Sequence, residues 1–220
     1  TVLSLNWFEY IKKGKLYDNL ENTNIRYIIF SWSSGSGKTT QVQTLYDFQS
    51  DSLYIAKRYI TRIPRNWDNQ DGFIENIYIW TYKEFQELIN NWTIDIYRKR
   101  DLWSHSVMYW FENCSKIYEN KNKIIIYSGN NDMIRNLDQI NFYNKNEILH
   151  IHIVADDNDT RFINRSPEIL DWDLKQFEKR MNDKWEDVFD KAHIVIYNSR
   201  NMQYTIKNEL EEMIRNLLNI

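Results

Sequence analysis

The sequence predicts an α/β fold with three layers, in which a central parallel sheet lies between two layers of helices. Two observations support this class. Short apolar runs alternate with helical patterns along most of the 220 residues, at the spacing that is typical of βαβ units. The apolar runs are also nearly continuous, as in residues 28–32 and 124–127, which is the pattern of strands buried on both faces.

Each element follows from its local pattern, taken in chain order. Apolar runs predict strands at residues 26–32, 53–60, 123–127, 148–154 and 193–197. Helical periodicity predicts helices at residues 39–48, 81–90, 104–120, 159–165, 167–187 and 203–218, and one that begins at residue 131. The last helix is amphipathic, with an apolar face made of Ile206, Leu210, Met213, Ile214 and Leu217. In residues 1–25 we expect a helical extension, with Trp7, Phe8 and Ile11 packed on the core.

Composition excludes several classes of protein. With 42% hydrophobic and 15% aromatic residues, the chain can bury a sizeable core, so wholesale disorder is excluded. The formal net charge of -3 argues against nucleic acid as the main partner, and no apolar stretch reaches the roughly 18 residues of a membrane span. Cys114 is the single cysteine, and residues 1–10 lack the pattern of a signal peptide. We therefore expect a soluble cytoplasmic protein.

Glycine marks the first functional motif. The chain has only five glycines, a share well below the average of roughly 7%, yet Gly35 and Gly37 lie one residue apart. They belong to the segment Ser33-Ser34-Gly35-Ser36-Gly37-Lys38-Thr39-Thr40, which follows a predicted strand and precedes a predicted helix. This is the arrangement of a phosphate-binding P-loop.

The residue types of this segment suit the binding of a nucleoside triphosphate. Glycines let the backbone curl so that successive N–H groups point at phosphate oxygens, and the helix N-terminus adds its dipole. Lys38 would reach the β- and γ-phosphates and the Thr39 hydroxyl would ligate Mg²⁺, so ATP and Mg²⁺ are the expected cofactors. Trp32 stands where the first glycine of the motif falls. The predicted phosphate-binding residues are Ser34, Gly35, Ser36, Gly37, Lys38, Thr39 and Thr40.

A basic segment follows the second predicted strand. Arg58, Arg62 and Arg65 lie near a turn, where arginines can hold a second phosphoryl group by bidentate pairing. Taken by itself, the segment is better interpreted as a solvated basic loop. Its place downstream of the phosphate loop favours the phosphoryl-binding interpretation.

Several segments resemble the guanylate kinase family. The order of the phosphate loop, Thr61-Arg62-Ile63-Pro64-Arg65 and Asp71-Gly72 is similar to that of guanylate kinases. Arg58 to Arg62, followed by Glu75-Asn76 and Glu84-Phe85, looks even closer to the ribose 1,5-bisphosphate phosphokinases, which are relatives of guanylate kinase. The resemblance implies a P-loop kinase domain at residues 26–220. It also implies an inserted acceptor-binding subdomain at about 58–105 and a helical lid at about 158–187.

Two later segments carry the same resemblance. Arg161, Arg165 and Arg180 resemble the arginines of the family's mobile lid, which close over the transferring phosphoryl group. Arg161 and Arg165 are four residues apart, so they share a helix face. Residues 193–198 resemble the final strand and the loop near the adenine, which implies an adenine-side role for Asn198.

The segments that correspond to the guanine-binding segments of guanylate kinases differ from them in sequence. The strand end at residues 126–129 lacks the acidic residues of guanylate kinases, and Trp103-Ser104 stands at their Tyr-Gly position. Glu75 falls near the position of their acceptor-site tyrosine, and Asp95 aligns with one guanine-reading carboxylate. The resemblance thus implies acceptor contacts from Glu75, Asp95 and Trp103.

Other polar residues have simpler interpretations. His150 and His152 alternate on a predicted strand, so we expect them on one sheet face rather than as metal ligands. Asp156 and Asp157 follow that strand, and a loop cap is favoured there over a Mg²⁺ site. The run Arg98-Lys99-Arg100 is either a solvated face or a further contact with the acceptor.

We therefore expect a kinase that transfers the γ-phosphoryl group of ATP to the phosphate of a small phosphomonoester, with Lys38, Arg161, Arg165 and Arg180 as catalytic residues. A nucleoside or deoxynucleoside monophosphate is the first choice of acceptor, and ribose 1,5-bisphosphate or another sugar phosphate is the alternative. Two hypotheses of other classes stay open. One is a catalytically silent guanylate kinase-like binding module, and the other is a kinase that acts on a nucleotide within DNA or RNA. The sequence does not indicate the oligomeric state.

Overall fold

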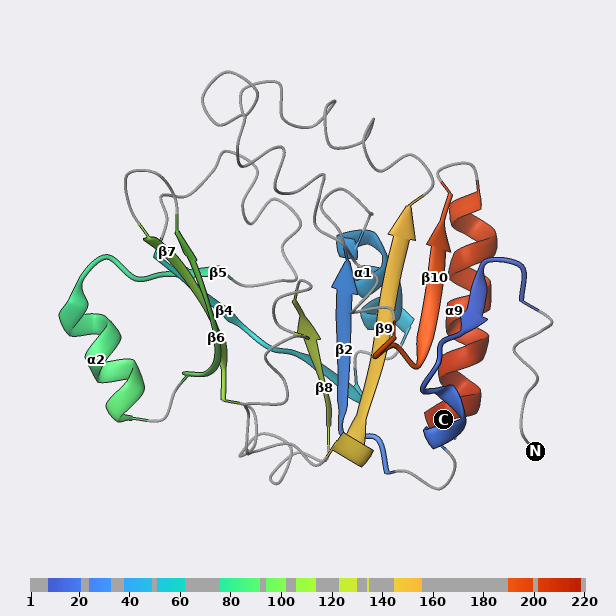
Figure 1. Ribbon diagram of the computed structural model, residues 1–220, viewed down its shortest axis with the longest axis horizontal. Coiled ribbons are helices and arrows are strands. Elements are labelled where there is room, and N and C mark those ends of the chain that lie inside the picture. The colour runs from blue at the N-terminus through green and yellow to red at the C-terminus, as the bar shows by residue number, and fades with distance from the viewer. Residues whose placement is uncertain are drawn as a thin grey trace, which may run out of the picture.

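The structure is a computed structural model, and its elements form two sheets (Figure 1). We call the six-stranded sheet the central sheet and the four-stranded sheet the side sheet. The residues that the structure describes are 8–20, 24–32, 38–48, 51–61, 76–91, 94–101, 106–113, 123–129, 134, 145–155, 190–199 and 202–218.

The central sheet has the strand order β1-β10-β9-β2-β8-β3. All its neighbouring strands are parallel except β1 and β10, which are antiparallel. The mostly parallel α/β sheet predicted from the alternating pattern is therefore confirmed. Its strands are β1 (Ile11–Lys13), β2 (Tyr27–Trp32), β3 (Leu53–Ile55), β8 (Ile124–Ser128), β9 (Ile148–Ala155) and β10 (Ile194–Asn198), and the short 3-10 helix η4 (Lys145–Glu147) precedes β9.

Helices α1 (Lys38–Phe48) and α9 (Gln203–Leu218) cover one face of the central sheet (Figure 1). Val42 and Leu45 of α1 pack in one core with Ile28, Phe30 and Ile126 of the strands. Burial of one such side chain stabilises the fold by about 1.5–3 kcal/mol. The predicted apolar face of α9 is confirmed, because its residues Ile206, Leu210, Met213 and Ile214 are all buried.

The opposite face of the central sheet is aromatic and polar. Tyr27 and Ile29 of β2 and Tyr127 of β8 belong to its apolar cluster, together with Phe111 of the side sheet. The alternation of these residues with those of the α1 face is the period-2 pattern of a strand. Both faces of β2 are thus buried, as its continuous apolar run predicts.

The N-terminal segment differs from the expected helical extension, because its described part forms a strand and a 3-10 helix. β1 pairs with β10, and η2 (Tyr17–Leu20) follows after a turn at Gly14. The Gly14 N–H donates to the His193 carbonyl oxygen at 2.8 Å. A Cβ at residue 14 would lie 2.2 Å from the Ala192 carbonyl oxygen, so glycine permits this close approach. Phe8 and Ile11 are buried in the core, as predicted.

A carboxylate of α9 holds the chain before β1. Glu209 accepts hydrogen bonds from the backbone N–H groups of Glu9, Tyr10 and Ile11, the last two at 2.9 and 3.0 Å. Hydrogen bonds to an ionised acceptor are stronger than neutral ones. The segment is therefore attached both to the sheet edge and to the last helix.

The side sheet has the strand order β5-β4-β7-β6. Its strands are β4 (Arg58–Ile60), β5 (Asn76–Tyr78), β6 (Ile94–Asp101) and β7 (Ser106–Glu112). Two sequence predictions are wrong here. The apolar run at residues 53–60 forms two strands in different sheets, because the chain crosses between the sheets at Ala56 and Lys57 without a glycine or proline to mark the break. The expected helix at residues 104–120 contains β7, since pairing with β4 and β6 outweighs the helical periodicity of a segment rich in β-formers.

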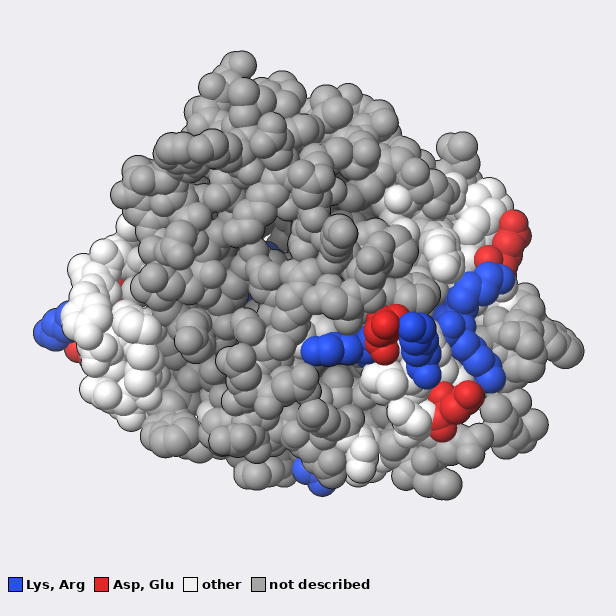
Figure 2. Space-filling view, in the orientation of Figure 1, with Lys and Arg blue, Asp and Glu red and all other residues white. Residues whose placement is uncertain are grey.

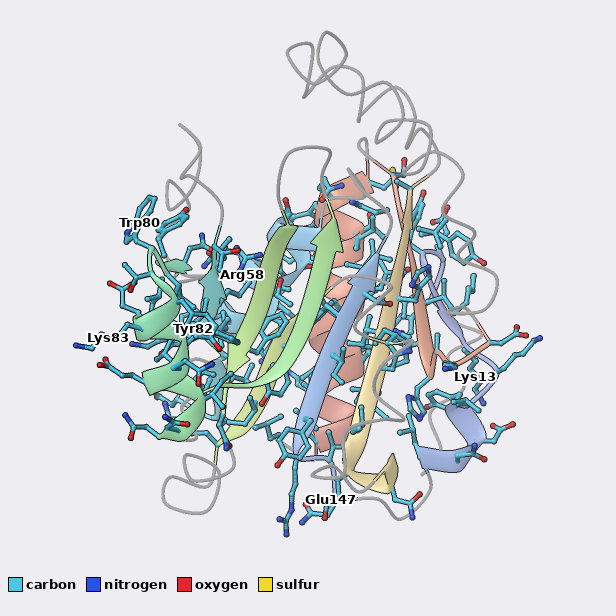
Figure 3. The ribbon with its side chains drawn as sticks, turned by 60° about the vertical axis from the view of Figure 1, so that its left-hand side comes forward. Lys13, Arg58, Trp80, Tyr82, Lys83 and Glu147 are labelled. Carbon is cyan, nitrogen blue, oxygen red and sulfur yellow. The ribbon has the colours of Figure 1, made fainter. Side chains whose placement is uncertain are left out.

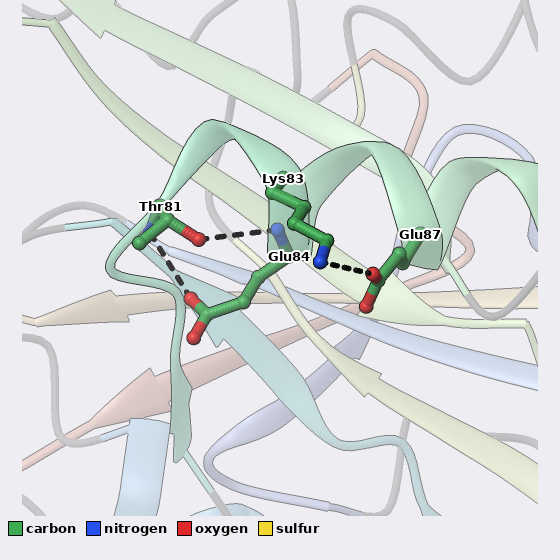
Figure 4. Close-up of polar contacts among 4 residues, drawn as sticks. All are labelled: Thr81, Lys83, Glu84 and Glu87. Carbon is green, nitrogen blue, oxygen red and sulfur yellow. Dashed lines mark hydrogen bonds and ion pairs between the residues drawn. The ribbon is translucent and has the colours of Figure 1, made fainter.

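Helix α2 (Tyr82–Asn90) packs on the side sheet, and the helix predicted at residues 81–90 is confirmed. Thr81 is its N-cap: its Oγ1 accepts the Glu84 N–H at 3.2 Å, while Glu84 accepts the Thr81 N–H at 3.0 Å (Figure 4). This reciprocal capping box satisfies two free donors of the first turn. Trp80 and Lys83 point outward on the α2 side of the molecule (Figure 3).

Glu112 joins the two sheets where the chain crosses between them. Its Oε2 accepts the Tyr54 hydroxyl at 2.6 Å and the Lys57 N–H at 3.3 Å, and its own N–H donates to the Lys57 carbonyl oxygen at 3.0 Å. Phe111 packs edge-on against Tyr127 of β8, with 5.5 Å between ring centroids. The two sheets therefore touch near β8.

The described surface carries charges of both signs. Lys15 pairs with Asp190 at 2.5 Å and Arg26 with Glu147 at 3.4 Å, and basic and acidic side chains lie side by side on the face in Figure 2. Within the described ranges, no helix is both long enough and apolar enough to cross a membrane.

Candidate phosphate-binding site

The strand and the helix that flank the predicted phosphate loop meet at the carboxyl edge of the central sheet. The parallel strands β2, β8, β9 and β10 end at this edge, which is where open α/β sheets bind ligands. β2 ends at Trp32 and α1 begins at Lys38. Residues 33–37, which include Ser34, Gly35, Ser36 and Gly37, join them and lie outside the described residues. The strand before the loop and the helix after it are confirmed.

The first turn of α1 brings backbone donors to this edge. Lys38, Thr39 and Thr40 are the first three residues of the helix, and its first turn contains no acidic residue. The first N–H groups of a helix have no acceptor within the helix, and the dipole favours an anion at its N-terminus. Thr40 is exposed. This end of α1 is therefore suited to a phosphate group.

Two buried side chains near this edge each have a polar atom that lacks a hydrogen-bond partner in the described part of the chain. Ser128 ends β8 as the register partner of Phe30 and is 2% exposed, and Gln41 of α1 is 1% exposed. The atoms without a partner are Ser128 Oγ and Gln41 Oε1. Ser128 lies on the α1 face, because Ile126, two residues before it, packs in the core with α1. A buried polar atom without a partner costs about 1–3 kcal/mol, so a polar ligand at this edge would offset that cost.

Asn198, the predicted adenine-side residue, lies at the end of β10 in a cluster of amides. Its Oδ1 accepts hydrogen bonds from Gln203 Nε2 at 2.6 Å and from Gln41 Nε2 at 3.5 Å. Asn198 is 1% exposed, so its side chain links β10 to the first turns of α1 and α9. The structure thus brings Asn198 close to the start of α1, and its role toward adenine stays a prediction.

A network of histidines lies on the other face of the same strands. Ser31 Oγ is 2.5 Å from His150 Nε2 and 2.8 Å from His152 Nδ1. His150 Nδ1 is 2.9 Å from the Lys191 carbonyl oxygen, which can only accept, so Nδ1 carries the proton. The Ser31 hydroxyl therefore donates to His150 Nε2, and its oxygen accepts the Nδ1–H of His152. The prediction that His150 and His152 share a sheet face is confirmed.

His193 completes this network and takes the other tautomer. Its Nδ1 accepts the backbone N–H of His150 at 2.9 Å, so its proton lies on Nε2. The network joins β2 and β9 to the turn before β10. It holds the end of β2 in place one residue before Trp32, where the predicted phosphate loop begins.

Burial keeps all three imidazoles neutral near pH 7. It lowers the pKa of His150 to about 3 and the pKa values of His152 and His193 to about 4, because an imidazolium loses its hydration there. The hydrogen bond to the Lys191 carbonyl raises the pKa of His150. At the low pH where His150 titrates, the positive charges of His152, His193 and Lys191 lower it further. Among the residues that the structure describes, no three His, Cys, Asp or Glu side chains form a site for a metal ion.

The predicted acceptor residues that the structure describes lie in the side sheet. Arg58 begins β4, and Asp95 lies in β6 within the stretch from Ile94 to Tyr97, where the register with β7 shifts. The remaining predicted acceptor and lid residues lie outside the described part of the chain: Arg62, Arg65, Glu75, Trp103, Arg161, Arg165 and Arg180.

Sequence reasoning missed three residues at the ends of the strands and helices. Ser31, Gln41 and Ser128 are small or neutral polar residues next to the loop, and nothing in their spacing sets them apart. A signal was available for Ser31 and Ser128, since each is a lone hydroxyl within an apolar strand. Such a hydroxyl must find a partner when it is buried.

No protein-family model and no curated protein matches the chain. Among solved structures, the crystal structure of guanylate kinase from Anaplasma phagocytophilum is similar at a TM-score of 0.47 and 14% identity, over 91% of this chain and 87% of that chain. The crystal structure of APE1195 is similar at a TM-score of 0.37 and 11% identity, over 89% of this chain and 97% of that chain. Likenesses at these scores carry no argument about function.

Proposed function

We propose that the chain is an ATP-dependent kinase that phosphorylates the phosphate group of a small phosphomonoester, with a nucleoside or deoxynucleoside monophosphate as the first choice of acceptor. An oxygen of the acceptor phosphate attacks the γ-phosphorus, the bond from the γ-phosphorus to the β–γ bridging oxygen breaks, and ADP leaves. Such a transfer depends on positioning and charge neutralisation more than on covalent catalysis.

The observation that carries the proposal is the junction between β2 and α1. A Gly-Ser-Gly-Lys-Thr sequence joins a buried parallel strand to a helix whose first turn has no acidic residue. The unpartnered atoms of Ser128 and Gln41, within the described residues, add support for a polar ligand at this edge. We assign the phosphate contacts to Ser34 through Thr40 of this segment.

The donor side of the reaction uses the start of α1. Lys38 neutralises the β- and γ-phosphates, and the Thr39 hydroxyl is the proposed ligand of Mg²⁺. The metal ion, when bound, adds positive charge next to the phosphoryl group in transfer. Asn198 lies on the proposed adenine side, where Gln203 fixes the orientation of its amide.

The acceptor side uses the side sheet and the segment that follows β4. Arg58, Arg62 and Arg65 hold the acceptor phosphate, and Glu75, Asp95 and Trp103 contact the rest of the acceptor. Arg161, Arg165 and Arg180 belong to the proposed lid, which excludes water during transfer and so prevents hydrolysis of ATP.

A sugar phosphate such as ribose 1,5-bisphosphate is the second candidate acceptor, and the end of β8 favours it. This strand end reads Ile126-Tyr127-Ser128-Gly129 and has no carboxylate to accept the donor groups of a guanine ring. The residues that we propose to bind phosphate could bind the phosphate group of either acceptor.

ATP binding by calorimetry tests the proposal before any acceptor is known. We expect Lys38→Ala to lower the affinity for ATP at least tenfold, because a charge-assisted contact with phosphate is lost. Lys83→Ala is the matched control, since Lys83 is exposed on α2 and pairs only weakly with Glu87 at 3.9 Å. The donor site would be refuted if Lys38→Ala bound ATP with an affinity within twofold of that of the parent. It would also be refuted if the parent did not bind ATP, and that result would favour a binding module.

A further inference from the structure

A cluster of three amide side chains joins three elements at the carboxyl edge of the central sheet. Gln41 is the fourth residue of α1, Asn198 is the last residue of β10 and Gln203 is the first residue of α9. Gln203 Nε2 donates to Asn198 Oδ1 at 2.6 Å, and Gln41 Nε2 lies 3.5 Å from Asn198 Oδ1 and 3.4 Å from Gln203 Oε1. Gln41 and Asn198 are each 1% exposed, so water has little access to the contact between α1 and β10.

The contacts of Gln203 fix the direction of the amide of Gln41. Gln203 Nε2 also donates to the Ser199 carbonyl oxygen at 2.9 Å, so Gln203 turns its oxygen toward Gln41. Gln41 therefore faces two amide oxygens, and only its NH₂ group can donate to them. Its own Oε1 has no partner among the described residues. Because an apolar side chain of similar volume would avoid burying that oxygen, packing alone does not explain a glutamine at this position.

The cluster has a tight part and a loose part. The hydrogen bonds of Gln203, which are 2.6 and 2.9 Å long, join the end of β10 to the start of α9. The two contacts of Gln41, at 3.5 and 3.4 Å, are longer than the usual N–H···O range of about 2.7–3.2 Å. A small displacement of α1 toward β10 would bring both contacts into that range. Gln41 is thus the adjustable link between α1 and the tight part of the cluster.

The same turn of α1 contains the proposed phosphate contacts. Gln41 follows Lys38 by three residues, which is about 4.5 Å along the helix axis and less than one turn. The hydrogen bonds of the helix hold this turn together, so a displacement of Gln41 toward Asn198 also moves the first N–H groups of α1. The position of the phosphate side is therefore coupled to the position of the end of β10.

We propose that Gln41 is a positioning residue for ATP, which links the adenine side at the end of β10 to the phosphate side at the start of α1. This inference rests on the proposed kinase function, because it concerns the donor nucleotide of that reaction. ATP spans both sides, so its binding gains when Gln41 holds them in the correct relative position. Inorganic tripolyphosphate occupies the phosphate side alone, and its binding does not depend on the link.

Calorimetry on the full chain with ATP and with tripolyphosphate, each in the presence of Mg²⁺, tests this role. Gln41→Leu keeps most of the side-chain volume and removes the amide. We expect it to lower the affinity for ATP about fivefold to tenfold, which is a modest coupling between two sites. The affinity for tripolyphosphate should stay within about twofold of the parent, since it is outside this coupling. A glutamine that only fills the core would change the two affinities alike.

The double variant Gln41→Leu/Gln203→Leu tests whether the link runs through the cluster. Gln203→Leu releases Asn198, so it should also lower the affinity for ATP and leave tripolyphosphate binding unchanged. The double variant should bind ATP as weakly as the weaker of the two single variants, because both substitutions break the same link. Losses of ATP affinity that multiply in the double variant would overturn the role of the cluster.

Gln43→Leu is the matched control, because it makes the same substitution on the same helix, where Gln43 Nε2 donates to Asp47 within α1. It should leave the ratio of the two affinities as in the parent. A loss of ATP affinity in Gln43→Leu equal to that in Gln41→Leu would overturn the inference. If Gln41→Leu melts more than a few degrees below the parent, Gln41→Met replaces it with the same expectation.

Binding by the parent chain separates a failure of this inference from a failure of the proposed function. If the parent binds both ligands and Gln41→Leu keeps their ratio, the positioning role is refuted and the donor site stands. Binding of only one of the two ligands also refutes the positioning role, because it requires a phosphate side that binds either ligand. Binding of neither ligand refutes the donor site and the inference together.

Discussion

Acidification from pH 7 to pH 5 should remove a large part of the folding free energy through His150, His152 and His193. Their pKa values are about 3, 4 and 4 in the folded chain, against an ordinary value of 6.5. Because burial lowers these pKa values, the stability from the neutral imidazoles is fully present above pH 6.5. It is lost as the pH falls from 6.5 toward the folded pKa values.

The magnitude follows from the difference in protonation. At pH 5 the unfolded imidazoles are protonated and the folded ones are almost entirely neutral. Since pH 5 is about 1.5 units below the unfolded pKa and one unit corresponds to about 1.36 kcal/mol, each histidine contributes a loss of about 2 kcal/mol. Three histidines give about 6 kcal/mol, against a total stability of roughly 5–15 kcal/mol for a typical domain.

Urea unfolding followed by tryptophan fluorescence at pH 7, 6 and 5 measures this loss. His193→Asn is the informative variant, because an asparagine oxygen can replace Nδ1 as the acceptor of the His150 N–H. We expect it to reduce the loss between pH 7 and pH 5 by about one third, since one of three titrating groups is gone. A free energy of unfolding that changes by less than about 1 kcal/mol between pH 7 and pH 5, or an unchanged pH dependence in His193→Asn, would refute the reasoning.

Three further predictions concern the N-terminal segment and the lid. Gly14→Ala should lower the melting temperature by about 4–8 °C, because a Cβ 2.2 Å from the Ala192 carbonyl oxygen forces a shift that costs about 2 kcal/mol; a melting temperature equal to that of the parent contradicts this. Glu209→Ala should cost about 3 kcal/mol in urea unfolding, since three backbone N–H groups lose a charged acceptor. The exposed Glu212→Ala should cost less than about 0.5 kcal/mol, and equal costs would remove the special role of Glu209. Arg161→Ala should slow ADP release on the order of 10³-fold, and turnover within a few-fold of the parent would show that the lid assignment is wrong.

The central sheet could be predicted because its strands and helices have strong local patterns. β2 is a nearly continuous apolar run, β9 is apolar except for His150 and His152, and α9 repeats its apolar residues at helical spacing over 16 residues. Burial on two faces leaves few alternatives for such sequences. The start of α2 could also be predicted from the sequence, because a Thr followed three residues later by a Glu, here Thr81 and Glu84, is the pattern of a capping box.

The side sheet and the N-terminal strand could not be predicted from local pattern. β7 contains aromatic residues that suit either a helix or a strand, and its partners β4 and β6 decide the outcome. β1 has only three residues and is held by β10 and Glu209. The chain passes from β3 to β4 without a turn residue, and Glu112, more than fifty residues later, holds that crossing.

The candidate site was predicted where chemistry demands particular residue types. Glycines, lysine and threonine at fixed spacing indicate a phosphate loop because few other arrangements bind a triphosphate. Ser31 and Ser128 were missed because the role of a single hydroxyl depends on the groups that surround it in the folded chain, which the local sequence does not show. The alternation of His150 and His152 indicated that they share a sheet face. Their partner Ser31 could not be predicted, because it lies 119 residues before His150 in the chain.

Acceptor-stimulated ADP release, with Lys38→Ala beside the parent, tests the central claim most directly. The acceptors would be the ribo- and deoxynucleoside monophosphates, ribose 5-phosphate and ribose 1,5-bisphosphate, each with ATP and Mg²⁺. The account predicts that at least one of these acceptors accelerates ADP release and that Lys38→Ala abolishes the acceleration. ATP binding without acceleration by any acceptor, or an acceleration that survives Lys38→Ala, would contradict a phosphate-transferring site at the start of α1.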